Sequence, residues 1–194
     1  MYLCVLFVIF KNKRKEFIFI ILTFIATIVL CDQLSSGLIK PLVERLRPSH
    51  EPTLSGLVHL VNGYKGGQFG FVSSHTANSF GFAMLSVLLF RYRPYTFFVF
   101  AWALLNSYSR IYLGVHYPLD VICGAAVGII SALFVYILSN YIKKIYTGFN
   151  YKRLGGTKVS VSGFEYKDIR LIIFFLLLTV LFISIFVFET FKYI

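Results

Sequence analysis

Five long apolar runs alternate with short polar connectors along this chain of 194 residues. The runs cover residues 17–34, 76–90, 95–113, 119–142 and 171–188, and each is close to the length that a membrane-crossing helix needs. A shorter apolar run precedes Lys11 and falls well below the roughly 20 residues of a full span. The pattern predicts an all-α protein, a polytopic transmembrane helical bundle of about five to six spans.

The same pattern predicts a single membrane domain that covers residues 1–194. We expect its motif-bearing core over residues 17–142, a basic cytoplasmic connector over 143–169 and an additional C-terminal transmembrane helix over 170–191.

Composition agrees with a membrane protein. Hydrophobic residues make up 58% of the chain, charged residues 14%, and the mean hydropathy is +0.77, whereas about a quarter of the residues of a soluble domain are charged. The three cysteines, Cys4, Cys31 and Cys123, lie inside apolar runs and form no pair typical of a disulfide or zinc site. We interpret them as packing residues.

The net charge of +11 does not point to nucleic acid, because Lys and Arg occur in short clusters between apolar runs. The connectors "KNKRK", "RYRP" and residues 143–158 are basic, and they alternate with the less basic segments 41–70 and 114–118. By the positive-inside rule the basic connectors face the cytoplasm. We therefore expect a multi-pass protein of the inner (cell) membrane whose other polar segments share the periplasmic, or extracytoplasmic, face.

The first polar cluster on that face is "KPLVERLRP". Lys40 and Arg47 are seven positions apart, about two helical turns, so both cations can lie on one helix face and bind an anion. The alternative is that both side chains reach the membrane interface as ordinary helix-end cations.

The second cluster, "GFVSSHTANSFG", places Ser73, Ser74 and His75 at the start of an apolar helix. Free N–H groups at a helix N-terminus favour a bound phosphate, and the two hydroxyls add donors. The alternative is an ordinary N-cap followed by an interfacial histidine.

The third cluster is "SRIYLGVHYPLD", with Ser109, Arg110, His116 and Asp120. A carboxylate bonded to one ring nitrogen leaves the other nitrogen of His116 free as a nucleophile, and a guanidinium such as that of Arg110 binds phosphate oxygens in pairs. The alternative is a structural Arg and Asp pair at helix ends. Only a shared function explains all three clusters on one face of the membrane.

In order and spacing, residues 40–120 resemble the type 2 phosphatidic acid phosphatase (PAP2) family, with its motifs KxxxxxxRP, PSGH and SRxxxxxHxxxD. The first and third motifs match at every fixed position, whereas Val72 and Ser74 replace the Pro and Gly of the second. The resemblance implies a helical bundle related to soluble acid phosphatases and vanadate-binding haloperoxidases, with no metal and no cofactor. His50, Glu51 and His59 fit no common metal site by their spacing.

The resemblance also implies the role of each matching residue. His116 would be the nucleophile that forms a phosphohistidine, Asp120 would orient it, and His75 would protonate the leaving oxygen. The remaining matching residues would bind the phosphoryl oxygens, and these are Lys40, Arg47, Ser73 and Arg110. Ser74 offers a further backbone N–H to the same phosphate. Altered geometry of the second motif would affect phosphate binding first.

An apolar bundle with a phosphate site at the membrane boundary suits a lipid phosphate substrate. Undecaprenyl diphosphate is the preferred candidate by analogy alone, and phosphatidic acid, phosphatidylglycerophosphate and lipid A phosphates fit equally well. The alternative class is a phospholipid-binding or lipid-transporting protein that has lost turnover. Retention of His116, His75 and Asp120 argues against that alternative, because binding requires neither a nucleophile nor an acid.

Overall fold

The computed structural model describes residues 2–54, 56–147, 160 and 163–191. Within these residues the regular structure is helical. The main helices are α1 (Tyr2–Asn12), α2 (Phe17–Asp32), α3 (Lys40–Val43), α4 (Ser74–Phe90), α5 (Arg93–Tyr112), α6 (Pro118–Thr147) and α7 (Tyr166–Phe191). A π-helical segment, Gln33–Ile39, joins α2 to α3, so one helical stretch runs from residue 17 to residue 43.

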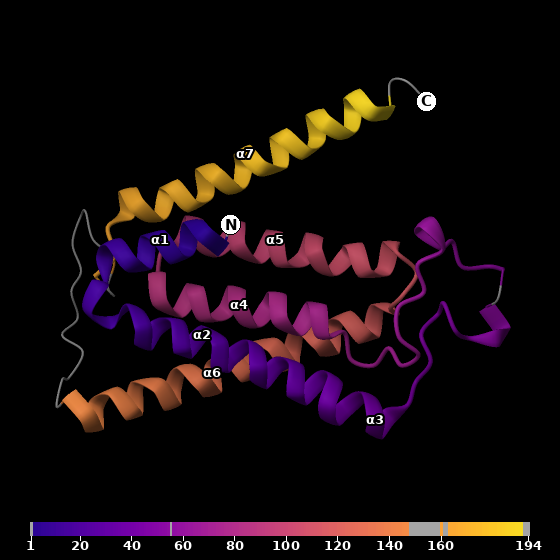
Figure 1. Ribbon diagram of the computed structural model, residues 1–194, viewed down its shortest axis with the longest axis horizontal. Helices are drawn as coiled ribbons and strands as arrows, with labels where there is room; N and C mark the ends of the chain where they lie inside the picture. Colours follow the sequence, from indigo (N-terminus) through magenta and orange to yellow (C-terminus); the bar gives the residue numbers. More distant parts are fainter. Residues whose placement is uncertain (1, 55, 148–159, 161–162, 192–194) are drawn as a thin grey trace.

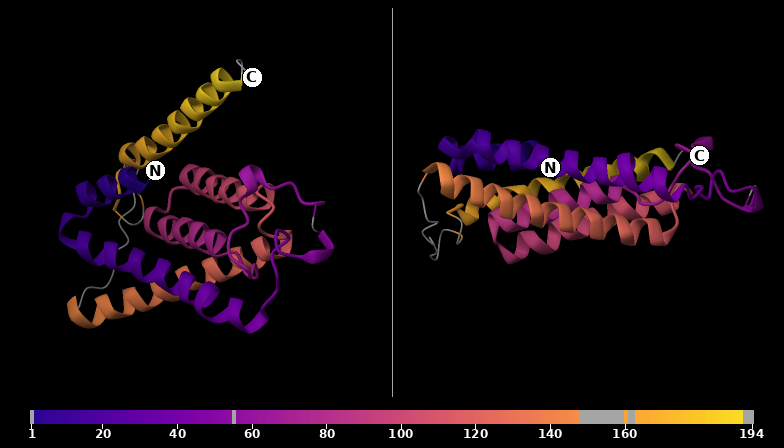
Figure 2. Two further views of the ribbon diagram at one scale, coloured as in Figure 1. Left: turned by 45° about the vertical axis from the view of Figure 1, so that its right-hand side comes forward. Right: turned by 90° about the horizontal axis from the view of Figure 1, so that it is seen from below.

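Helix α4 is the centre of the bundle. It packs against α2, α5 and α6, and most of its side chains are buried, polar ones such as Ser79 and Ser86 included. Figure 1 shows α4 between these neighbours, and Figure 2 shows α7 projecting away from them. The all-helical class expected from the sequence is confirmed.

Small residues allow α4 and α6 to approach closely. Gly124 and Gly128 lie one turn apart on α6 and face Ser73 and Ala77. A Cβ atom at Gly124 would lie 2.6 Å from the carbonyl oxygen of Ser73, which is closer than nonbonded atoms pack. The absence of side chains therefore lets α6 bring its first turn against the start of α4, as in other close helix pairs built on small residues.

Two helices extend past the boundaries expected from the sequence. Helix α6 continues to Thr147, and α7 begins at Tyr166 rather than at residue 170, so the connector between them is shorter than 143–169. Both extensions follow from the side chains: α6 carries apolar Ile145 beyond its lysines, and Asp168 in the first turn of α7 favours the positive end of the helix dipole. The central part of the connector lies outside the described residues.

Two helical stretches among the described residues are long and apolar enough to cross a membrane. They are Arg14–Val43, with a mean hydropathy of 2.4, and Pro118–Ile145, with a mean hydropathy of 2.6. The other predicted spans do not meet this criterion of length and composition among the described residues. The count of five to six spans therefore stays a prediction.

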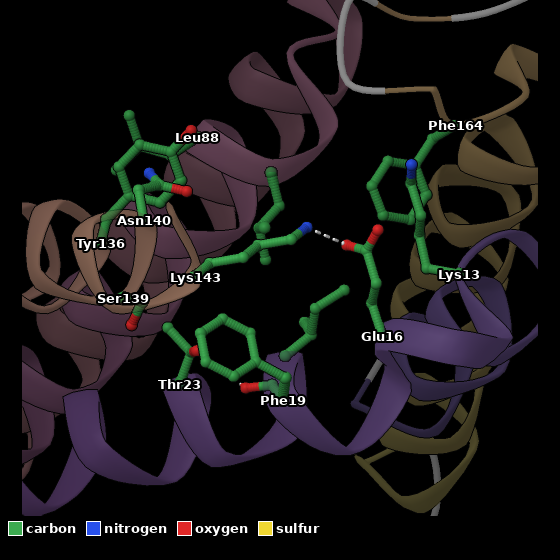
Figure 3. A pocket seen from close by; sticks show the side chains of 12 residues that line it. Lys13, Glu16, Phe19, Thr23, Leu88, Tyr136, Ser139, Asn140, Lys143 and Phe164 are labelled. Atoms are coloured by element: carbon green, nitrogen blue, oxygen red, sulfur yellow. Dashed lines mark hydrogen bonds and ion pairs between the residues drawn. The ribbon is translucent and has the colours of Figure 1, made fainter. Parts of the chain in front are cut away.

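The end of the bundle that carries the basic connectors is tied together by charge. Lys143 of α6 donates to the carboxylate of Glu16 at 2.6 Å, and Figure 3 shows this pair beside Lys13, Tyr136 and Asn140. The cavity between these residues has a volume of about 30 Å³, enough for only a few water molecules. This end therefore has a polar closure but little room for a ligand.

Candidate active site

The three polar clusters meet at the opposite end of the bundle. There the loop segments 44–54 and 56–73 lie beside the start of α4, the end of α5 and the start of α6 (Figure 1). A bridge between Leu46 and Phe69 closes the loop on itself. Segments up to 80 residues apart in the chain are thus brought to one place.

His116 and Asp120 form the buried centre of the site. Their side chains are 2% and 0% exposed, and His116 Nδ1 lies 3.3 Å from Asp120 Oδ2. Oδ2 also accepts the backbone N–H of Tyr117 at 2.9 Å. Assigning the imidazole proton to Nδ1 satisfies this network and leaves the Nε2 lone pair free. Nε2 is therefore the ring nitrogen whose lone pair points away from Asp120.

The turn before His116 depends on Gly114. Its φ of +69° lies in the left-handed region, which a residue with a Cβ atom rarely adopts. A Cβ atom there would also lie 2.6 Å from Val58 Cγ1. The turn between α5 and α6 therefore has the place and the length that the sequence predicts.

Arg47 lies on the free side of the imidazole. Its Nη1 atom is 3.4 Å from His116 Nε2, and its Nε atom donates to the Phe69 carbonyl at 3.1 Å. The interpretation that Lys40 and Arg47 share one helix face is wrong, because α3 ends at Val43 and Glu44 has a φ of +49°. Arg47 reaches the site from the loop instead.

Lys40 reaches the site from the first position of α3, near the end of the helical stretch 17–43. Its Nζ atom donates to Ser74 Oγ at 2.6 Å, and Ser74 Oγ is also 2.8 Å from Ser36 Oγ. Ser74 stands where the PAP2 motif has Gly. Its hydroxyl therefore holds the lysine at the mouth of the site.

Ser73 and His75 occupy the N-terminus of α4. Ser73 is the N-cap, and its backbone N–H donates to the carbonyl of Asp120 at 3.0 Å. Its hydroxyl accepts from Thr76 and makes no cap bond. His75, two positions later, is exposed. A backbone hydrogen bond thus joins the second motif to the third. The exposed imidazole of His75 is accessible to a ligand.

Arg110 lies at the end of α5, where its Nε atom donates to Ser109 Oγ at 3.3 Å. Burial lowers the pKa of Arg47; Tyr64 raises it, and the positive charge of Arg110 lowers it. Two guanidinium groups that influence each other in this way attract an anion to the space between them. All eight residues predicted from the sequence therefore lie at this end of the bundle.

Arg45 is a site residue that the sequence reasoning missed. Its Nη2 atom donates to Asp120 Oδ1, and its guanidinium lies 4.9 Å from the ring centre of Phe71 and 5.0 Å from that of Tyr117. Arg45 Nε has no hydrogen-bond partner among the described residues. A third cation inside "KPLVERLRP" was the available signal, but nothing in the spacing connects it to Asp120.

The environment of His116 keeps its imidazole neutral. Its pKa is lowered from 6.5 to about 3, chiefly by burial and also by the positive charges of Arg47 and Lys40 and by the nearby His75, while a hydrogen bond with the backbone of Gly70 raises it. A neutral imidazole has the lone pair that a nucleophile needs.

We expect the Cε1 carbon of His116 to keep the chemical shift of neutral imidazole from pH 8 to about pH 4. The chain has four histidines, so ¹³C-labelled protein in micelles and a His116→Asn variant would identify the signal. Since the unfolded chain binds this proton at a higher pH, the stability from neutral His116 is complete above about 6.5 and is lost as pH falls toward the folded pKa. A titration midpoint near 6.5 would contradict the buried neutral state.

Among the described residues, no three His, Cys, Asp or Glu side chains come close enough together to hold a metal ion. The positive charge at the site comes from Lys40, Arg45, Arg47 and Arg110. The arrangement can hold a phosphate, attack it with an imidazole nitrogen and offer a proton to a leaving oxygen.

Residues 17–144 match the PAP2 superfamily. The chain is 41% identical over 142 residues to a lipid A 4'-phosphatase of Porphyromonas gingivalis, an alignment that covers 73% of this chain and 60% of the relative. A lipid A 4'-phosphatase of Bacteroides thetaiotaomicron is 42% identical over 142 residues, or 72% of this chain and 63% of the relative.

A bacitracin transport permease protein of Bacillus licheniformis is 44% identical over 66 residues, which are 34% of this chain and 32% of the relative. The chain thus spans about three fifths of the length of the two lipid A 4'-phosphatases that it matches. No solved structure matches it significantly.

Proposed function

This chain belongs to the PAP2 superfamily, and from that premise we propose that it is a membrane lipid phosphatase that works through a phosphohistidine at His116. The arrangement of His116 between Asp120 and Arg47 carries the proposal. One ring nitrogen is held by a buried carboxylate, and the other faces a guanidinium where a phosphoryl group would bind.

The reaction has two steps. In the first, His116 Nε2 attacks phosphorus, the bond from phosphorus to the lipid oxygen breaks, and protonated His75 gives its proton to that oxygen. In the second, water attacks the phosphohistidine, His75 takes back a proton, and the bond between phosphorus and Nε2 breaks to release inorganic phosphate. Asp120 stabilises the imidazolium that exists between the steps.

Charge stabilisation comes from the basic side chains. Phosphoryl transfer spreads negative charge over the equatorial oxygens, so catalysis rests on positioning and on fixed positive groups. Lys40, Arg47 and Arg110 supply these, together with the N-terminus of α4 at Ser73 and Ser74. We infer that the reaction requires no added metal ion.

The relatives favour a lipid A phosphate monoester as the substrate to test first. Two proteins named lipid A 4'-phosphatase are 41% and 42% identical to the chain, whereas the preference for undecaprenyl diphosphate rests on analogy alone. The site would face the periplasmic side of the inner membrane, as the basic connectors at the other end favour.

A binding or transport protein without turnover is the second candidate, and the match to a protein named as a transport permease supports it. Binding alone gives no reason for His116 to be held neutral by burial or for Asp120 to be fully enclosed. We therefore rank it below the phosphatase.

The test measures inorganic phosphate released in detergent micelles from lipid A, undecaprenyl diphosphate and phosphatidic acid, first without EDTA and then with EDTA. We expect steady release from lipid A, at rates that EDTA does not reduce. Release that stops in EDTA and returns with Mg²⁺ would contradict the proposed charge stabilisation. Well-folded protein that releases phosphate from none of the three would favour the binding or transport candidate.

A further inference from the structure

An apolar groove lies directly below the candidate active site, between α1, α2 and α4. Its volume is about 510 Å³, which is within the range of ligand sites in proteins. Helix α1 forms one wall through Val5 and Leu6, and α1 lies outside the residues that match the PAP2 superfamily.

The helix that forms the second wall of the groove, α2, leads toward Lys40. Ile21, Ile25 and Val29 recur every four residues, so they lie on one helix face, and that face extends for about 12 Å. Ile25 and Val29 are each 53% exposed. Since α2 runs on through the π-helical segment to Lys40, the groove and the phosphate site lie at successive depths along the same helix.

The α4 wall makes the same connection. His75, Asn78 and Phe82 are spaced by three and four residues, so they form one stripe along α4. Asn78 lies about 4.5 Å deeper along the helix axis than His75. Along this stripe the side chain changes from the imidazole of His75 to the amide of Asn78 and then to the buried ring of Phe82.

Asn78 brings an amide to the groove, whose lining is otherwise apolar apart from the hydroxyl of Tyr2, and this amide is incompletely bonded. Its Oδ1 atom is buried and has no hydrogen-bond partner among the described residues. A buried amide oxygen without a donor is unfavourable. A ligand that brings an N–H or O–H group to this depth would supply the missing bond.

We propose that this groove binds the hydrocarbon chain of the lipid substrate and that Asn78 selects a lipid with an N–H or O–H donor near its phosphate. The inference rests on the proposed function, because it places the phosphate of the same lipid at His116. It favours phosphorylated lipids with amide-linked or hydroxylated chains over prenyl diphosphates, whose isoprene units carry no donor.

The first test measures binding without turnover. The chain has one tryptophan, Trp102, and its ring lies 5.8 Å from that of Tyr2 and 6.1 Å from that of Phe82, both of which line the groove. Ceramide 1-phosphate with a brominated acyl chain should quench Trp102 fluorescence saturably in His116→Asn protein, and unlabelled ceramide 1-phosphate should reverse the quenching.

Val29→Phe places a ring in the groove and should weaken this binding by about tenfold. Leu22→Phe is the matched control, since Leu22 is exposed on α2 and does not line the groove. Quenching that does not saturate, or that Val29→Phe and Leu22→Phe change equally, would overturn the groove assignment.

The second test compares kcat/KM for ceramide 1-phosphate, which has N–H and O–H donors, with that for phosphatidic acid of the same chain length, which has ester acceptors there. We expect Asn78→Leu to lower the ratio of the two values by about tenfold. Asn140→Leu makes the same change at the far end of the bundle and should leave the ratio as it is. An unchanged ratio in Asn78→Leu would overturn the selection by Asn78.

The two proposals fail in different ways. Saturable quenching that Val29→Phe weakens, without phosphate release by wild type, would retain the groove and reject the phosphatase. Phosphate release without saturable quenching would retain the phosphatase and reject the groove.

Discussion

The His116→Asn variant is expected to lose phosphate release from every lipid substrate by roughly 10³-fold or more, because it lacks the nitrogen that attacks phosphorus. Asn is a suitable replacement, since its amide can still donate to Asp120 from a site that is 3% exposed in the parent protein. Initial rates with a saturating lipid phosphate would give the loss in kcat directly.

The phosphohistidine intermediate can be detected directly by labelling. Brief incubation of wild type with a ³²P-labelled lipid phosphate, followed by alkaline quenching, should leave label on the protein that acid removes, as is typical of a phosphorus–nitrogen bond. The His116→Asn variant should carry no label, and its melting temperature should equal that of wild type, which shows that the variant is folded. Labelling of the variant at the wild-type level would place the nucleophile elsewhere.

The Arg45→Met variant is expected to have the second largest effect. Asp120 is fully buried, and Arg45 is the cation that donates to its Oδ1 atom. Removing one member of a buried ion pair leaves an uncompensated charge, which costs about 3 kcal/mol or more. We expect a lower melting temperature in detergent and a fall in kcat of about 100-fold with little change in KM, since Arg45 acts through Asp120 rather than on substrate.

A double-mutant cycle separates positioning from general damage. In Asp120→Asn protein the buried charge is gone, so adding Arg45→Met should lower kcat and stability much less than it does in wild type. Arg45→Lys should recover part of the stability, because it keeps the charge but loses the planar stacking between Phe71 and Tyr117. Equal losses in both backgrounds would mean that Arg45 does not act through Asp120.

The three polar clusters could be recognised from sequence because each is local. His116 and Asp120 are four residues apart at the start of a helix, so their contact follows from helix and turn geometry alone. Ser73, Ser74 and His75 needed only the start of the apolar run that became α4. The turn at Gly114 followed from a glycine between two apolar runs.

Contacts between distant segments were beyond the same reasoning. Lys40 and Arg47 do meet the site, but through a helix end and a loop rather than along one helix face. The role of Ser74 as the partner of Lys40 could not be foreseen either, since 34 residues separate them. Spacing along the chain carries no information about such pairs until the helices are packed.

The sequence by itself determined the helical class and the order of the motifs, because hydrophobic period and helical spacing act over a few residues, and it proposed His116 as the nucleophile. Only the tertiary structure decided that Arg45 donates to the carboxylate of Asp120 and that Gly124 lets α6 reach the start of α4. It also decided that Asn78 lines a groove one helical turn from His75. Each of these depends on two helices, or a helix and a loop, meeting at a particular depth, and that is fixed by the shapes of all the side chains between them.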